Sequence, residues 1–342
     1  MTTRPRFVRT LAAAGTAAAT LVLAACGSGS SDETDTATDA GSGSFEPVTL
    51  EHALGETTIE ERPDRVATWG WGSADAAIAL GVVPVAIPRT AYAGDQDGML
   101  PWNKEAIEAA GAEPPTMLTE AEEPPYEEFI KADPDVILAT YSGLTQEQYD
   151  KLSKIAPVVA YPDQPWATPW RDVITTAGEA LGKTDEADQV LADIDRAVSK
   201  AADAHPEFQG KTIAAVADYG SFYVYRSADP RVQFLEDLGF ETAPSVEKLD
   251  TEESSFYFTL SYEKVDQLDS DVLLSYADSP QTQKAFMNAA STTTLPQYDA
   301  GTIAEATGEE LVASVSPPTA LSLTWGLDAY VDLLSEAAAE VS

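Results

Sequence analysis

The sequence predicts an α/β fold made of two similar lobes that are joined by one long helix. Three observations support this prediction. Short apolar strands alternate with helices along the chain, one strand-and-helix pattern occurs twice, and a long amphipathic helix separates the two copies. Alternation of this kind is typical of largely parallel sheets that are covered by helices.

The beginning of the chain predicts export. Residues 1–25 combine three arginines with an apolar, alanine-rich stretch, which is too short to span a bilayer but suits a signal peptide. Cys26 follows directly and is the only cysteine, so it cannot form an internal disulfide. Residues 26–47 consist mainly of small and polar residues, a composition that predicts a flexible tether.

The first ordered elements alternate between strands and helices. Alternating residues on both sides of a glycine-containing turn predict a β-hairpin over 48–59. The elements expected next are a strand at 65–69, a helix at 73–80 and a strand at 82–87. This order predicts parallel layering in the first lobe.

An internal repeat supports the second lobe. Glu127 stands in the first turn of one expected helix and Glu263 in the first turn of another, and each precedes an aspartate by eight positions. An apolar strand follows in each copy, at 134–141 and at 270–276. Two copies with the same spacing predict two lobes of similar construction.

The segment between the copies predicts a single helix. Asp185 is expected to cap its start and Pro206 to stop it. About 20 residues at 1.5 Å per residue give a rod of roughly 30 Å, long enough to brace both lobes. The apolar residues that share one face of this helix are Val190, Leu191, Ile194, Ala197, Val198 and Ala201.

These elements divide the exported part into three regions. The sequence predicts a first lobe over 48–184, the connecting helix over 185–205 and a second lobe over 206–342. The second lobe is expected to begin with a strand at 211–216 and to end with a helix at 327–338.

Composition excludes several classes of function. A formal net charge of −37 excludes nucleic acid as a partner, because phosphate backbones require clustered lysine and arginine. His52 and His205 are the only histidines, which argues against a site for a bare zinc or manganese ion. No phosphate-binding loop or nucleophile elbow is present, so nothing in the sequence indicates catalysis or a resident cofactor.

Six short segments together carry a family resemblance. With them in this order, the chain after the tether resembles periplasmic binding proteins for iron siderophores and cobalamin, in the group whose lobes are joined by a single long helix. The resemblance implies the class III architecture, with two Rossmann-like lobes around mostly parallel sheets. The segments are Arg62-Pro63-Asp64-Arg65-Val66-Ala67, Leu80-Gly81-Val82-Val83-Pro84-Val85, Pro134-Asp135-Val136-Ile137-Leu138, Leu152-Ser153-Lys154-Ile155-Ala156-Pro157-Val158, Leu235-Glu236-Asp237-Leu238-Gly239-Phe240 and Trp325-Gly326-Leu327.

The resemblance also implies a function in transport. Such a protein captures a ferric siderophore outside the cell as a monomer and delivers it to the permease dimer of an ABC importer, and the chelator itself holds the iron. Leu23-Ala24-Ala25-Cys26 resembles a lipobox, so Cys26 is expected to be acylated and to anchor the protein to the cell membrane.

In this family, one exposed glutamate on each lobe docks into arginine pockets of the permease. The matching residues are Glu127 and Glu263, and Glu128 is a competing candidate in the first lobe. Alternatively, both glutamates only complement the dipole of a helix.

The ligand is expected between the lobes, on loops that follow the carboxyl ends of strands. Aromatic side chains and arginines gather at these positions, although packing in the core is the alternative for each single aromatic residue. Arg62 and Arg65 are expected to be structural instead. The predicted ligand-binding residues are Trp69, Trp71, Arg89, Tyr92, Tyr141, Trp166, Tyr223, Tyr225, Arg226 and Tyr276.

The sequence is also compatible with other ligands and with other classes of protein. Cobalamin or haem also suits an aromatic cleft, and a membrane-anchored hydrolase or an envelope scaffold could use the same fold. Among siderophores, hydroxamates are favoured because a triply anionic catecholate would oppose the negative field of the protein. One continuous helix between lobes predicts only modest closure on binding.

Overall fold

A computed structural model describes residues 45–341. The expected signal peptide, Cys26 and the tether as far as residue 44 lie outside the described residues. Phe45, which the sequence assigns to the tether, is partly buried against the main hydrophobic core. Across 45–341, the helices are either too short or too polar to cross a bilayer.

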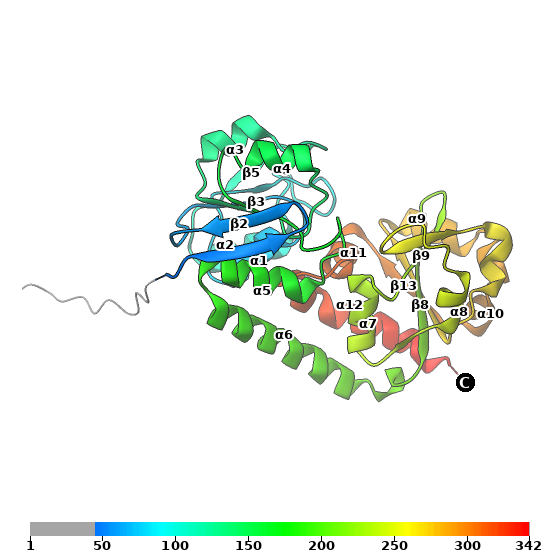
Figure 1. The fold of residues 1–342 in the computed structure, drawn as a ribbon. Helices are drawn as coiled ribbons and strands as arrows, with labels where there is room; N and C mark the ends of the chain where they lie inside the picture. Colours follow the sequence, from blue (N-terminus) through cyan, green and yellow to red (C-terminus); the bar gives the residue numbers. More distant parts are fainter. Residues whose placement is uncertain (1–44, 342) are drawn as a thin grey trace, which may run out of the picture. The chain divides into compact units, whose positions relative to one another are not determined.

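The first lobe is built on a five-stranded sheet in which every pairing is parallel (Figure 1). In spatial order the strands are β5 (Thr116–Leu118), β4 (Ala86–Pro88), β3 (Val66–Thr68), β6 (Val136–Leu138) and β7 (Val158–Val159). A separate antiparallel hairpin, β1 (Val48–His52) with β2 (Gly55–Ile59), confirms the hairpin that the sequence predicts.

Helices cover both faces of this sheet. Successive strand residues point to opposite faces, so Val136 packs toward one set of helices and Ile137 toward the other. One face packs against α1 (Ser73–Ala79) and α5 (Trp170–Leu181), and the opposite face against α3 (Tyr126–Ala132) and α4 (Gln146–Leu152). Helix α2 (Pro101–Ala109) packs against α1.

The second lobe is built on a mixed sheet. Strands β8, β12 and β13 pair in parallel, whereas β9 pairs antiparallel with β8 on one side and with the edge strand β11 on the other. In spatial order the strands are β11 (Tyr257–Leu260), β9 (Phe222–Tyr225), β8 (Thr212–Asp218), β12 (Val272–Ala277) and β13 (Ile303–Thr307), with β10 (Glu241–Thr242) beside the start of β8.

Helices cover this sheet on both faces as well. Helices α7 (Pro230–Asp237) and α12 (Ser322–Ala339) contribute to the main core, which also contains Leu274 and Tyr276 of β12. The opposite face packs against α8 (Pro244–Leu249) and α9 (Pro280–Met287). The remaining helical segments are α10 (Pro296–Ala300), α11 (Glu309–Val315) and the 3-10 turns η1 (Pro206–Phe208), η2 (Tyr262–Gln267) and η3 (Thr292–Thr294).

The internal repeat has a structural explanation for its aspartates. The Asp135 carboxylate accepts hydrogen bonds from the backbone N–H groups of Asp64 and Arg65, just before β3. Asp271 accepts in the same way from the N–H and the hydroxyl of Thr212, at the start of β8. Each aspartate therefore fixes the entrance of the neighbouring central strand in its own lobe.

The predicted connecting helix is α6 (Thr184–Ala204), which passes from the first lobe to the second (Figure 1). All six predicted apolar residues are buried or partly buried, which confirms the predicted face. Asp185 does not cap the helix, because the helix already begins at Thr184 and Lys183 is its N-cap. Asp185 lies in the first turn, where a carboxylate complements the helix dipole.

Other elements also differ from the prediction in their bounds or their type. Strand β4 begins only at Ala86, because Pro84 lacks the N–H group that a central strand requires. The second copy of the repeat forms the 3-10 segment η2 rather than an α-helix. The terminal helix begins at Ser322 rather than Leu327, and the Thr319 hydroxyl accepts the N–H of Ser322 at 3.2 Å.

Arg171 joins both lobes to α6. Its guanidinium forms ion pairs with Asp195 on α6, at 2.7 Å, and with Asp237 on α7, at 2.9 Å. Because Arg171 itself lies on α5 of the first lobe, one side chain connects three parts of the chain.

Candidate ligand-binding site

A cavity of about 290 Å³ opens at the carboxyl end of the first lobe's sheet. This position is the one at which open parallel sheets generally bind ligands. Four of the predicted residues line the cavity, namely Trp69, Trp71, Arg89 and Trp166. The loop after β5 adds two carboxylates that the sequence analysis did not select, Glu120 and Glu122.

Trp166 is held at the rim of the cavity in a strained conformation. Its φ of 59° lies in the left-handed region, which a bulky residue rarely adopts. Its ring packs edge-on against Tyr141, with centroids 5.7 Å apart, and it also lies against Gly143. A Cβ atom at position 143 would stand 2.3 Å from the indole nitrogen of Trp166, so only glycine allows this contact.

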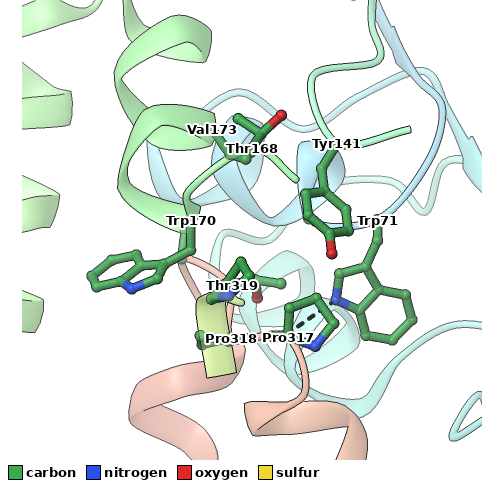
Figure 2. A pocket seen from close by; sticks show the side chains of 11 residues that line it. Trp71, Tyr141, Thr168, Trp170, Val173, Pro317, Pro318 and Thr319 are labelled. Carbon is green, nitrogen blue, oxygen red and sulfur yellow. Dashed lines mark hydrogen bonds between the residues drawn. The ribbon is translucent and has the colours of Figure 1, made fainter. Parts of the chain in front are cut away.

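A narrow crevice shares Trp71 with the cavity and also includes Pro230 of the second lobe; Figure 2 shows the side chains that line it. Trp71 and Tyr141 form one side of it, and Pro317 and Thr319 approach from the C-terminal part of the chain. The Trp71 indole N–H donates to the carbonyl oxygen of Pro317 at 3.3 Å. With a volume of about 10 Å³ the crevice has space for roughly one water molecule. A chelate therefore has room in the wider cavity and not in the crevice.

A buried carboxylate fixes the segment that forms the floor of this crevice. Asp75 of α1 accepts hydrogen bonds from the Trp102 indole at 2.6 Å and from the Thr319 hydroxyl at 2.5 Å. Burial raises the pKa of Asp75, and the hydrogen bonds from Thr319 and Trp102 oppose this shift. Asp75 therefore attaches the segment 315–320 to the first lobe.

The second lobe contributes a buried arginine. The Nε of Arg231 donates to Asp229 at 2.7 Å, and its guanidinium carbon lies 3.9 Å from the centre of the Tyr225 ring. Burial alone would lower the pKa of Arg231, but Asp229 and the tyrosines around it raise it instead. Arg231 therefore stays charged, close enough to Tyr141 of the first lobe to influence the pKa of that phenol.

Tyrosines surround this arginine and remain neutral. Burial raises the pKa values of Tyr141, Tyr225 and Tyr276, and the charge of Arg231 opposes each shift. The Tyr276 hydroxyl pairs with that of Tyr330 at 2.7 Å. Burial, together with Tyr225 and Asp278, raises the pKa of the half-exposed Tyr219 to about 12. The phenols can therefore donate hydrogen bonds at neutral pH.

The structure does not bring all ten predicted residues together. Tyr92 of the first lobe is half-buried, and burial is the main cause that raises its pKa. Tyr219 and Glu309, which both belong to the second lobe, raise the pKa of Tyr92 further. Tyr223 on β9 packs edge-on against Tyr257 of the edge strand β11 and does not line the cavity.

Arg226 also lies away from the cavity. Its guanidinium donates to the Asp250 carboxylate at 2.6 Å and to the carbonyl oxygen of Ser254 at 2.7 Å. These partners hold the side chain within its own lobe. Arg65 donates to the carbonyl oxygens of Ala132 and Asp133, which confirms its predicted structural role.

The sequence analysis missed Arg231, although the sequence contains a signal for it. Asp229 and Pro230 form a typical helix start, since Asp229 caps α7 and Pro230 occupies its first position. A cation in the first turn of a helix is unfavourable against the helix dipole. An arginine at that place therefore suggests a requirement other than helix stability.

The two predicted docking glutamates are both exposed. Across 45–341, the side chains of Glu127 and Glu263 form no hydrogen bond or ion pair with another described residue. Glu128, the competing candidate, accepts from both the N–H and the hydroxyl of Thr119. Its carboxylate is thus used within the first lobe, whereas that of Glu127 stays available.

The described part of the chain offers no cluster of three or more histidine, cysteine, aspartate or glutamate side chains that could hold a metal ion. Two α/β lobes that meet beside an aromatic cavity are instead the architecture of a binding protein. The chain belongs to the family described as periplasmic binding protein, whose model matches residues 66–295.

Two solved structures and one curated relative are similar over most of the chain. PiaA of Streptococcus pneumoniae TIGR4, in complex with ferrichrome, is 34% identical with a TM-score of 0.77 and covers 86% of this chain and 100% of its own. A periplasmic solute binding protein of Mycobacterium smegmatis is 26% identical, with a TM-score of 0.73 and coverage of 85% and 99%. "Probable siderophore-binding lipoprotein YfiY" of Bacillus subtilis is 28% identical over 285 residues, which are 79% of this chain and 80% of the relative.

Proposed function

We propose that this protein is the substrate-binding component of an ABC importer and binds a ferric siderophore of the hydroxamate class. The observation that carries the proposal is the arrangement of three tryptophans and Arg89 around the cavity of the first lobe. Aromatic walls supply rigid contact area, and a charged guanidinium can donate to the oxygens that surround Fe(III).

Two further points support a hydroxamate. The similar protein PiaA was crystallised with ferrichrome, a hydroxamate chelate. The buried arginine of the second lobe is already paired, since Arg231 forms an ion pair with Asp229. A triply anionic catecholate would find little unpaired positive charge there, whereas a neutral chelate needs none.

Intrinsic tryptophan fluorescence tests the ligand class, because three tryptophans line the cavity. We expect quenching at micromolar concentrations of a ferric trishydroxamate and much weaker quenching by a ferric triscatecholate. If cobalamin or haemin quenches the fluorescence saturably and the ferric hydroxamate does not, then cobalamin or haemin is the ligand and the siderophore proposal is wrong. Absence of binding by all four would contradict the proposal.

We further propose that the protein acts as a monomer, anchored to the outer face of the cell membrane by acylation of Cys26. It would dock on the permease dimer through Glu127 and Glu263. The support for docking comes from the internal repeat, which has a glutamate and an aspartate in both copies. Each aspartate forms hydrogen bonds within its own lobe, whereas the glutamate side chains form none with the described residues and stay available for a partner.

Charge reversal tests the docking proposal. We expect Glu127→Arg or Glu263→Arg to abolish iron uptake in a low-iron growth assay, while ligand affinity in vitro stays unchanged. Glu108→Arg, an exposed glutamate on α2, provides a matched control that keeps uptake. Normal uptake by both charge-reversed variants would remove the assignment. Labelling with a fatty-acid analogue, lost in Cys26→Ser, tests the anchor.

A further inference from the structure

The cavity of the first lobe has an unusual distribution of charge for a site that has to accept a metal chelate. Two carboxylates, Glu120 and Glu122, line it together with three indole rings. Arg89 is the cation of the lining, and its Nη2 donates to the carbonyl oxygen of Gln96 in its own loop at 2.7 Å. Among the described residues, neither glutamate forms an ion pair with lysine, arginine or histidine.

The position of Glu120 is fixed by the fold. One oxygen of its carboxylate accepts the backbone N–H of Ala91 at 2.8 Å, which ties the loop after β5 to the loop after β4. A carboxylate held in this way cannot swing far from the cavity to find a cation in solvent. Its charge therefore remains part of the wall.

Trp166 provides a surface that suits a cation. Its side chain is 41% exposed although the backbone strain at this residue is unfavourable. The contacts with Gly143 and Tyr141 hold the indole at the rim of the same cavity. The face of an indole ring attracts ammonium groups, and tryptophan is the strongest of the aromatic side chains in this respect.

The charges across the cleft add to this effect. Arg231 of the second lobe is already paired with Asp229. Asp278 and Glu309 lie close enough to Tyr92 to influence its pKa. The walls that face the ligand therefore carry more negative than positive charge, and a recessed site concentrates that field.

We infer that the cavity holds a subsite for an ammonium group of the ligand, formed by Glu120 and Glu122 with the indole of Trp166. This inference rests on the proposed function and narrows it. The iron core of a trishydroxamate is neutral, so a pendant primary amine gives the whole chelate one positive charge. The ligand class is a ferric hydroxamate that carries a protonated amine.

A pair of probes isolates the ammonium group. The first probe is a linear ferric trishydroxamate with a terminal primary amine, and the second is the same chelate with that amine acetylated. We expect the wild-type protein to bind the amine form about tenfold more tightly, in the range that cation–π and carboxylate contacts supply. The preference should weaken as salt is added.

Matched variants locate the subsite. In Glu120→Gln/Glu122→Gln the affinity ratio between the two probes should fall to about one, and glutamine at 120 still offers an oxygen to the N–H of Ala91. Glu123→Gln removes the same charge from the same loop but outside the lining, so it should keep the tenfold ratio. Thermal melting checks that each variant is folded.

The possible results separate the inference from the proposed function. Equal affinity of the wild-type protein for both probes overturns the ammonium subsite while the siderophore proposal stands. A ratio that persists in the double variant also overturns it, because the discrimination then arises elsewhere. Binding of neither probe contradicts the proposed function, and the subsite with it.

Discussion

The two walls of the cleft come from lobes of similar architecture, yet they are built differently. The first-lobe wall is open, with tryptophans around a cavity of about 290 Å³ and carboxylates without a cationic partner in the described residues. The second-lobe wall is closed, with Arg231 buried between Asp229 and Tyr225. One lobe thus offers space and exposed aromatic surface, and the other a charged side chain whose orientation is fixed by its own partners.

This difference has an energetic reason. A buried guanidinium that is already oriented loses little conformational entropy when a ligand arrives, so its hydrogen bonds contribute fully to affinity. Such a donor is costly to build, because the charge has to be desolvated and paired in advance. Tryptophans at an open rim cost less to build and tolerate chelates of different shape.

Replacing Arg231 should have the largest effect. We expect Arg231→Ala to weaken ligand binding by about 100-fold, as removal of one partner from a buried charge pair does. The variant should also lose about 3–5 kcal/mol of stability, since Asp229 is left buried without its counter-charge. Isothermal titration and chemical denaturation measure the two effects.

A double variant separates these two effects. Asp229→Asn/Arg231→Gln removes both charges, so most of the stability should return while the loss of affinity remains. Wild-type affinity in this double variant would mean that the second-lobe wall does not contribute a charged donor.

Replacing Asp75 tests how strongly the segment 315–320, which forms the floor of the crevice, is attached to the first lobe. Asp75→Ala removes the acceptor of both Trp102 and Thr319 and should cost about 2–4 kcal/mol of stability. Asp75→Asn keeps an oxygen for these donors and removes the charge, so its stability at neutral pH should equal or exceed that of the wild type.

The pH dependence of Asp75 follows from its raised pKa. The native state binds the Asp75 proton more tightly than the unfolded state does, so this group stabilises the fold below its ordinary pKa. That contribution is lost as the pH rises through the raised folded pKa. Thermal melts should therefore show that the advantage of Asp75→Asn over the wild type grows between about pH 4 and pH 7. A constant difference would contradict the raised pKa.

The fold could be predicted from sequence because its signals are local or periodic. The apolar face of α6 repeats at helical spacing, and all six of its residues are indeed buried or partly buried. The aspartates of the repeat, Asp135 and Asp271, recur because each fixes the start of a strand. Pro84, by contrast, shortened a strand that the apolar pattern alone would extend.

The site was predictable only in part, because orientation depends on partners that lie elsewhere in the chain. Arg226 and Arg231 stand only five positions apart, yet Arg226 pairs with Asp250 and Arg231 with Asp229. Nothing local in the sequence distinguishes these outcomes, except the unfavourable place of Arg231 in the first turn of a helix. The approach of Pro317 to Trp71 joins residues 246 positions apart, which no periodicity reveals.

Trp166 provides a smaller test, on the first-lobe wall. We expect Trp166→Gly to lower ligand affinity about tenfold, because the exposed indole is lost. Stability should stay the same or rise by up to about 1 kcal/mol, since glycine adopts a positive φ without strain. A variant that lost stability and kept its affinity would show that Trp166 is a packing residue.

Arg226 should give the smallest effect on binding and is the matched control for Arg231. Arg226→Gln breaks the ion pair with Asp250, which is partly exposed, so we expect a loss of about 1 kcal/mol of stability. Ligand affinity should change by less than about threefold, because the guanidinium is held within its own lobe by Asp250 and Ser254. A loss as large as that of Arg231→Ala would mean that Arg226 leaves these partners when the ligand binds. The second-lobe wall would then be rearranged by its ligand rather than built in advance, and the contrast between the two walls would disappear.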